Sequence, residues 1–178
     1  RILILNYPSN PTGCTYTDDQ LLAIANVARK YRLILLSDEI YGEVHFEGRH
    51  KSIARYYPEG TIISTSLSKW AGAGGWRLGT FIFPRELRPL QDAMAIIASE
   101  TYTATSAPIQ HAAIAAFNGG DDIDEYLKQS RRVLKVVGEY MHRRLSDMGA
   151  VVQKPEGAFY LFPDFSGFSE QLASKDIK

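Results

Sequence analysis

The sequence is poor in cysteine and carries no excess of either charge. Its single cysteine, Cys14, excludes an internal disulfide and a metal site built from clustered cysteines. Twenty basic residues balance twenty acidic ones, whereas proteins that bind nucleic acid or anionic membranes usually carry a basic excess. We therefore expect neither nucleic acid nor a membrane as a partner, and the lack of a disulfide framework is typical of a cytoplasmic protein.

Long apolar runs are also missing. The longest ones, such as residues 94–98 and 112–117, are far too short to cross a bilayer, and no signal peptide opens the chain. Hydrophobic residues make up 45% of the 178 residues and charged residues 22%, close to the averages of globular proteins. We therefore expect one packed domain or parts of two. Because the chain starts at Arg1 and stops within a helical pattern, we expect it to be part of a longer protein.

Short strand-like runs alternate with helical patterns over the first two thirds of the chain. After the first run, Thr17 and Gln20 have the spacing of a capping box, which predicts a helix. Residues 84–100 and 107–117 also follow a helical pattern. Runs that are apolar on both faces are typical of a mainly parallel sheet covered on both sides. The strand-like runs are residues 2–5, 33–36, 61–64 and 79–83.

The clearest break in the chain is Asn118-Gly119-Gly120. A long amphipathic helix follows the break, and strand-like runs come after it at residues 150–153 and 158–162. We therefore expect residues 1–118 to form part of a large α/β domain and residues 119–178 to form part of a smaller α+β domain.

Four segments carry polar side chains near the ends of predicted strands, where open α/β sheets bind ligands. Each segment alone is a weak signal, because it is equally typical of a turn, a helix cap or a solvated lysine. Their combination is specific, with Lys69 31 residues after Asp38 and Arg77 eight residues after Lys69. The segments are Asn10-Pro11-Thr12-Gly13, Ser37-Asp38-Glu39-Ile40-Tyr41, Ser66-Leu67-Ser68-Lys69 and Gly75-Trp76-Arg77-Leu78-Gly79.

In this combination the chain resembles the class I/II aminotransferases of the fold type I pyridoxal-phosphate (PLP) enzymes. The resemblance extends from Asn6 to Pro163. It implies the three-layer α/β sandwich of PLP-dependent transferases, with a mainly parallel sheet, plus part of a small α+β C-terminal domain. It also implies a homodimer, with the region around residues 102–106 near the partner subunit. The implied reaction moves an amino group between an amino acid and a 2-oxo acid.

The resemblance assigns a role toward pyridoxal 5'-phosphate to seven residues. Lys69 would hold the aldehyde as a Schiff base and, once freed, act as the general base. Asp38 would keep the pyridine nitrogen protonated, so that the ring withdraws electrons. Tyr41 and Asn10 would donate hydrogen bonds to the phenolic oxygen. The phosphate would be bound by Ser66, Ser68 and Arg77, the last through its planar guanidinium.

Two other interpretations fit the same motifs: a PLP-dependent carbon–sulfur β-lyase, and a non-catalytic PLP-binding domain of a transcription regulator. The family also uses an upstream segment with a ring that stacks on the cofactor, and a downstream arginine that binds the substrate carboxylate. The sequence has no counterpart of either, so the substrate stays open and we expect the isolated chain to be inactive. The histidines have no ligand-like pairing that predicts a metal site; they are His45, His50, His111 and His142.

Overall fold

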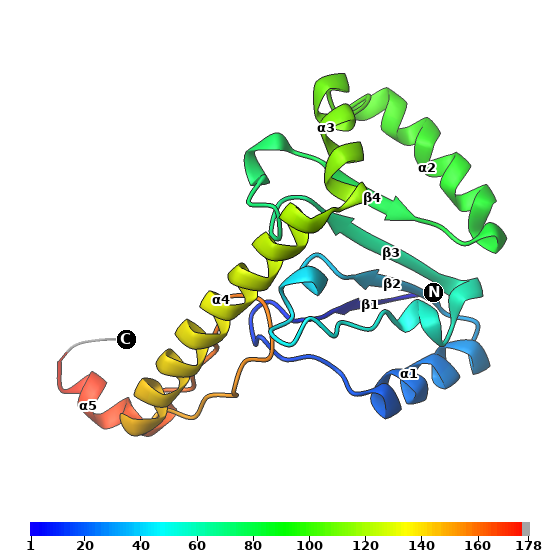
Figure 1. The fold of residues 1–178 in the computed structure, drawn as a ribbon. Helices are drawn as coiled ribbons and strands as arrows, with labels where there is room; N and C mark the ends of the chain where they lie inside the picture. The colour runs from blue at the N-terminus through cyan, green and yellow to red at the C-terminus, as the bar shows by residue number, and fades with distance from the viewer. Residues whose placement is uncertain (176–178) are drawn as a thin grey trace.

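The computed structural model describes residues 1–175, which contain a four-stranded sheet and several helices (Figure 1). The strand order is β1-β2-β3-β4; the first three strands are parallel, and β4 is antiparallel to β3. The predicted α/β fold with a mainly parallel sheet is therefore confirmed. The strands are β1 (Ile2–Asn6), β2 (Ile34–Asp38), β3 (Thr61–Ser66) and β4 (Gly79–Ile82).

The register of the sheet brings the polar segments to one edge. Asn6 at the end of β1 pairs with Asp38 at the end of β2, and Asp38 pairs with Ser64 of β3. Ser66 at the end of β3 pairs with Gly79 at the start of β4. The carboxyl ends of the parallel strands and the entry to β4 therefore lie side by side, where ligands bind in sheets of this kind.

Helix α1 (Asp18–Lys30) connects β1 to β2 and covers one face of the sheet. The predicted capping box is present: the N–H of Gln20 donates to Thr17 Oγ1 at 3.3 Å, and the N–H of Thr17 donates to Gln20 Oε1 at 2.9 Å. Leucine and alanine side chains of α1 are fully buried against β1 and β2, which builds the first hydrophobic core. This core contains Leu5, Tyr7, Leu21, Ala25, Ala28, Leu35, Ile53 and Tyr57.

The long helix α4 (Asp121–Asp147) packs against the loop that follows β2 and closes a second core. Arg131 of α4 pairs with Glu43 at 2.9 Å and Lys135 pairs with Glu47, so two basic residues of the helix hold the loop that follows β2. The second core contains Tyr41, Val44, Leu67, Trp70, Leu78, Ala113, Leu127 and Ala158. The remaining helices are α2 (Arg88–Thr101), α3 (Ala107–Asn118) and α5 (Ser169–Ala173).

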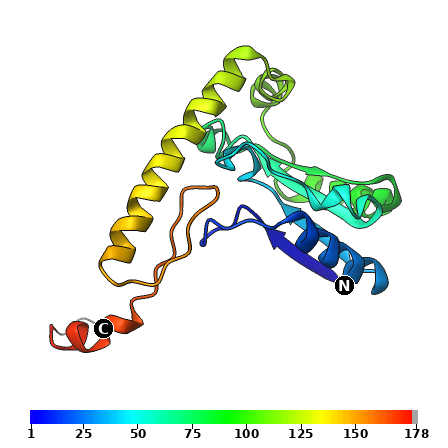
Figure 2. The same ribbon diagram turned by 60° about the horizontal axis from the view of Figure 1, so that its bottom comes forward.

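The two strands expected at residues 150–153 and 158–162 do not form, so this prediction is wrong. The region contains only isolated bridges, between Val151 and Asp164 and between His45 and Gly157. Its backbone groups bond instead to the loops after β1 and β2, and Figure 2 shows it returning between α4 and the loop that follows β1. An apolar run predicts burial, but a strand also needs a neighbouring strand, which this segment does not have.

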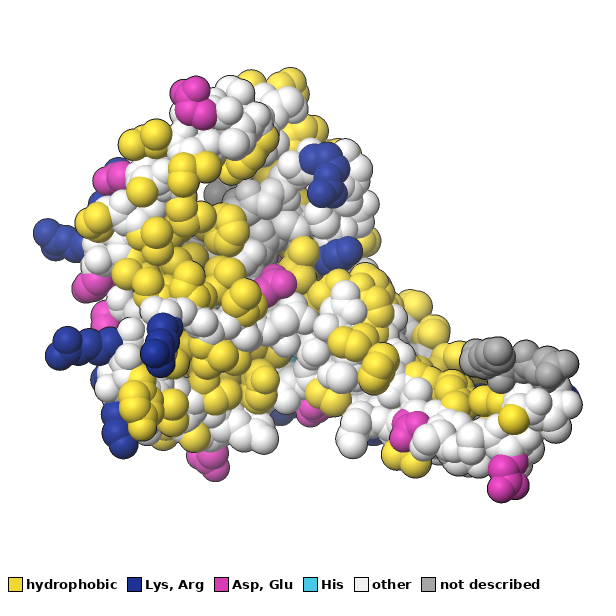
Figure 3. Space-filling view, turned by 180° about the vertical axis from the view of Figure 1, so that it is seen from behind, with side chains coloured by type: hydrophobic (Ala, Val, Ile, Leu, Met, Phe, Trp, Pro, Cys, Tyr) yellow, Lys and Arg dark blue, Asp and Glu magenta, His cyan; other side chains and the backbone are white. Residues whose placement is uncertain are grey.

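A wide apolar surface lies outside the two cores (Figure 3). Ile2 and Ile4 alternate with the buried Leu5 along β1 and are 61% and 64% exposed. Ile82 of β4 and Ile96 of α2 are exposed as well. Within residues 1–175, hydrophobic side chains of the sheet and of α2 are thus available for burial against further protein.

Two kinds of feature are missing from the part of the chain that the structure describes. None of its helices combines the length and the apolar character that a membrane span requires. It also contains no group of three or more His, Cys, Asp and Glu side chains placed to hold a metal ion.

Candidate functional site

Tyr41 lies at the centre of the predicted site. It follows β2 and is only 3% exposed, and Lys69 Nζ lies 5.9 Å from the centre of its ring. The backbone N–H of Asn10 donates to Asn6 Oδ1 at 2.7 Å, and Asn6 Nδ2 in turn donates to Asp38 Oδ2 at 3.1 Å, three residues before Tyr41. The structure therefore brings four of the predicted residues together from the loops that follow β1, β2 and β3.

Asp38 ends β2 with its carboxylate partly occupied by neighbouring donors. Asn6 Nδ2 donates to Asp38 Oδ2 at 3.1 Å, and the backbone N–H of Ile40 donates to Oδ1 at 3.4 Å. The second contact caps the turn that leads to Tyr41. An ionised carboxylate accepts about four hydrogen bonds. Asp38 can therefore cap this turn and still accept a hydrogen bond from a ligand.

The environment of Tyr41 favours the protonated form of its hydroxyl. Burial raises the pKa of Tyr41 well above its ordinary value of 10.0, and the hydrogen-bonded hydroxyl of Tyr160 and the negative charge of Asp38 act in the same direction. Asn10 lowers the pKa, but by less than burial raises it. Tyr41 is thus a hydrogen-bond donor at neutral pH, as a residue that binds a phenolic oxygen must be.

Lys69 lies on a turn that its neighbours anchor. Leu67 and Trp70 on either side are buried in the second core, which fixes the backbone at the lysine. The Lys69 side chain lines a hollow of about 460 Å³ together with α4 and Phe159. Lys69 therefore lies near the ring of Tyr41 and at the wall of this hollow.

The three predicted phosphate-binding residues lie at the neighbouring part of the same edge. Ser66 is buried, and its Oγ accepts a hydrogen bond from the N–H of Ser68 at 3.0 Å. Arg77 is exposed, has a left-handed backbone with φ of 56°, and donates through Nη1 to the carbonyl of Gly74 at 2.7 Å. A non-glycine residue in this conformation is uncommon and is often found at functional sites.

A second hollow, of about 640 Å³, opens beside Arg77. Hydroxyl-bearing residues of the segment between α2 and α3 line it, among them Tyr102, Thr105 and Ser106. This is the segment for which the sequence resemblance implies a nearby partner subunit. The combination of hydroxyl groups with a guanidinium is suited to an anionic ligand.

Tyr160 joins this site, although its position was predicted only as part of a strand. Its hydroxyl lies 2.7 Å from the hydroxyl of Tyr41, and the two rings meet edge to face with centres 5.5 Å apart. The one signal in the sequence was the Gly157-Ala158-Phe159-Tyr160 stretch within the family resemblance. Nothing in that stretch by itself indicates which residue Tyr160 contacts.

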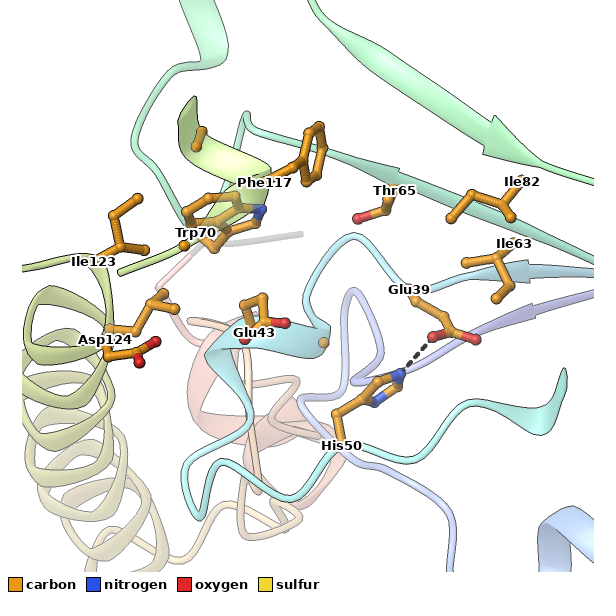
Figure 4. Close-up of a pocket in the computed structure, with 14 residues that line it drawn as sticks. Glu39, Glu43, His50, Ile63, Thr65, Trp70, Ile82, Phe117, Ile123 and Asp124 are labelled. Atoms are coloured by element: carbon orange, nitrogen blue, oxygen red, sulfur yellow. Dashed lines mark hydrogen bonds and ion pairs between the residues drawn. The ribbon is translucent and has the colours of Figure 1, made fainter. Parts of the chain in front are cut away.

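A second polar cluster is centred on Glu39, whose pairing with His50 is visible in Figure 4. The carboxylate of Glu39 pairs with His50 Nε2 at 2.8 Å and accepts hydrogen bonds from the hydroxyls of Ser37 at 2.8 Å and Ser52 at 2.5 Å. The cluster borders a pocket of about 420 Å³ whose other walls are mainly apolar. Glu39 thus fixes the loop from the side opposite the site.

Comparison with known proteins matches this chain to one family. The family model described as aminotransferase class I and II matches residues 1–177. A probable N-acetyl-LL-diaminopimelate aminotransferase of Bacillus subtilis is 37% identical over 94% of the chain and 41% of the relative's length. An aspartate aminotransferase of Bacillus subtilis is 32% identical over 99% of the chain and 45% of its own length.

Solved structures agree with this match. The structure of aspartate aminotransferase from Thermus thermophilus with maleate superimposes with a TM-score of 0.88 at 29% identity, over 99% of the chain and 47% of that protein. Alanine aminotransferase from Pyrococcus furiosus gives a TM-score of 0.78 at 35% identity, over 92% of the chain and 42% of that protein. The chain thus spans less than half the length of these relatives.

Proposed function

The chain belongs to the aminotransferase class I and II family, and we propose that the whole protein moves amino groups between an amino acid and a 2-oxo acid with pyridoxal 5'-phosphate as its cofactor. The observation that carries this proposal is the gathering of Asn10, Asp38, Lys69 and the buried Tyr41 at the carboxyl edge of the sheet. Relatives named as aminotransferases support amino transfer over the β-lyase and regulator interpretations.

The side chains present fit this cofactor. When bound, pyridoxal phosphate supplies an aldehyde that reacts with amines and a protonated ring that withdraws electrons from the substrate Cα. Asp38 has acceptor capacity left for the ring nitrogen, and Tyr41 has a protonated hydroxyl for the phenolic oxygen. Asn10 offers an amide donor beside Tyr41. The donors and acceptors of the site thus complement the polar groups around the cofactor ring.

Lys69 would carry out the covalent and proton-transfer work. Its amine is the group that would bind the aldehyde of the cofactor, and a substrate amine would take its place. The freed Nζ atom would then remove the proton from the substrate Cα and hold it for return to the cofactor side. Its place near Tyr41 and at the wall of an open hollow gives the amine room for both tasks.

Ser66, Ser68 and Arg77 would bind the phosphate. Short hydroxyls and a planar guanidinium are the groups that recognise phosphate oxygens with directed hydrogen bonds. Ser66 and Ser68 flank the turn to Lys69, and Arg77 comes two residues before the partner of Ser66 in β4. Anchoring the phosphate here would fix the distance between the cofactor ring and the lysine.

We also propose the organisation of the whole protein. Residues 1–118 would belong to its large domain and residues 119–178 to its small domain, because α4 starts after the Gly119-Gly120 break. The hollow beside Arg77 and the exposed apolar side chains of β4 and α2 support a homodimer. The single cysteine supports a cytoplasmic location.

Borohydride reduction of the full-length protein with pyridoxal phosphate tests this function. Peptide mass mapping should place the reduced cofactor on Lys69, and Lys69→Ala should remove the label together with amino transfer. A label spread over surface lysines would overturn the assignment. Transfer that depends on an oxo acid, measured against release of pyruvate and ammonia from cystathionine, separates the aminotransferase from a β-lyase.

A further inference from the structure

The contact between Tyr41 and Tyr160 joins two segments that lie 119 residues apart in the chain. The hydroxyl oxygens are 2.7 Å apart, a normal length for an O–H···O hydrogen bond. The rings meet nearly at right angles, at 87°, so that the two hydroxyls converge while the ring edges pack. Tyr160 is thus aimed at the one polar atom of the Tyr41 side chain.

The segment that carries Tyr160 is held by the same loops that carry Asn10 and Tyr41. The N–H of Ala158 donates to the carbonyl of Val44 at 3.1 Å, and the N–H of Gly157 donates to the carbonyl of Gly13 at 3.1 Å. Ala158 is fully buried and has a left-handed backbone with φ of 58°. A non-glycine residue keeps this conformation only where its surroundings impose it. The docking therefore sets the direction of Tyr160.

Two hydroxyl groups that share one hydrogen bond have one proton left over. If Tyr160 donates, the proton of Tyr41 is free for another acceptor. Without Tyr160, the hydroxyl of Tyr41 can rotate about its C–O bond. A partner that occupies the oxygen of Tyr41 therefore decides where its proton points.

We propose that Tyr160 is a positioning residue of the site, whose hydroxyl donates to the oxygen of Tyr41 and directs the Tyr41 proton toward the phenolic oxygen of the cofactor. This inference rests on the proposed function for the identity of that acceptor. The contact between the two tyrosines stands independently of it. In this role Tyr160 acts only through Tyr41.

Tyr160→Phe tests the proposal in the full-length protein, because it removes the hydroxyl and keeps the ring that packs on Tyr41. We expect its affinity for pyridoxal phosphate and its kcat/KM each to fall about fivefold, the size of one lost hydrogen bond. In a protein that already carries Tyr41→Phe, the change Tyr160→Phe should lower cofactor affinity and kcat/KM by less than about a further twofold. The reason is that Tyr160 then has no Tyr41 hydroxyl to direct. Tyr140→Phe, which removes an exposed hydroxyl of α4, is the matched control.

A second readout does not need the cofactor. In apo protein labelled with ¹³Cζ-tyrosine, the Tyr41 signal is identified by its loss in Tyr41→Phe. Tyr160→Phe should shift this signal and Tyr140→Phe should not. An unmoved Tyr41 signal, or full additivity of the Tyr41 and Tyr160 changes, would overturn the inference. Failure of the wild type to bind pyridoxal phosphate would instead overturn the proposed function, while the labelling experiment still decides the contact.

Discussion

The two parts of the candidate site are built differently: the part proposed to hold the cofactor ring, with Asp38 and Tyr41 (the ring side), and the part proposed to hold the phosphate, with Ser66, Ser68 and Arg77 (the phosphate side). On the ring side, Tyr41 is buried and its hydroxyl already has a partner, and Asp38 accepts two hydrogen bonds. On the phosphate side, Arg77 is exposed and its guanidinium bonds to its own turn. The ring side is thus preorganised by contacts between distant loops, whereas the phosphate side depends on local turns.

Because of this difference, we expect the two sides to contribute to different steps, the ring side to the reaction and the phosphate side to cofactor binding. Preorganised donors and acceptors stabilise charge that develops during a reaction, because they need no rearrangement. An exposed cation beside a wide hollow binds a charged group mainly by direct hydrogen bonds. We therefore expect changes on the ring side to reduce the rate and changes on the phosphate side to reduce cofactor affinity.

The largest effect should come from Asp38→Asn. An amide still hydrogen-bonds a ring nitrogen but does not hold its proton, so the electron-withdrawing power of the cofactor falls. A loss of about 4 kcal/mol of transition-state stabilisation corresponds to a rate about a thousandfold lower. The rate with saturating cofactor checks this, and cofactor affinity should change far less. A rate close to that of the wild type would mean that Asp38 only caps the turn.

Arg77→Ala should show the opposite pattern. Loss of hydrogen bonds from a charged donor costs about 1.5–3 kcal/mol, so cofactor affinity should fall by about tenfold to a hundredfold. The rate at saturating cofactor should stay near that of the wild type. Spectroscopic titration of the apo protein measures the affinity. Arg77→Lys keeps the charge but loses the planar guanidinium, so its cofactor affinity should lie between those of the wild type and Arg77→Ala. A lower rate with unchanged cofactor affinity would contradict the comparison of the two sides.

Gly157→Ala should loosen the ring side alone. A Cβ atom at this position would lie 2.7 Å from Pro8 Cγ and 3.1 Å from His45 Cα, so the docked segment would have to shift. Overpacking of this kind costs about 1–3 kcal/mol of stability. Urea unfolding measures the cost, with Gly167→Ala as the control because its added Cβ meets nothing within 4 Å. Equal losses in both variants would argue against tight docking.

The smallest effect concerns pH. Burial lowers the pKa of His45 below its ordinary value of 6.5, so the unfolded chain binds a proton at a higher pH than the folded one does. The contribution of neutral His45 to the free energy of unfolding is therefore fully present above pH 6.5. It is lost as the pH falls toward the lowered pKa of the folded state. When the pH is lowered from 7.5 to 5.5, the unfolding midpoint should fall less in His45→Gln than in the wild type. Equal decreases in the two proteins would exclude this role of His45.

Local sequence signals predicted most of the sheet correctly. The runs 2–5, 33–36, 61–64 and 79–83 all became strands, and the capping box at Thr17 formed as expected. These features depend on neighbours within one element or on the apolar character of a short run, both of which the sequence records directly. The same reasoning was wrong for 150–153 and 158–162, because an apolar run does not show whether a partner strand exists.

The sequence by itself determined which chemical groups this protein offers at its candidate site: an aspartate at the end of β2, and a tyrosine, a lysine and an arginine on the loops at the same edge of the sheet. Only the tertiary structure decided that Tyr160 meets Tyr41, that Glu39 is fixed by His50, and that the guanidinium of Arg77 stays open to solvent. The physical reason is that residue type and spacing specify chemistry and local conformation. Contacts between residues far apart in the chain arise only when whole elements pack.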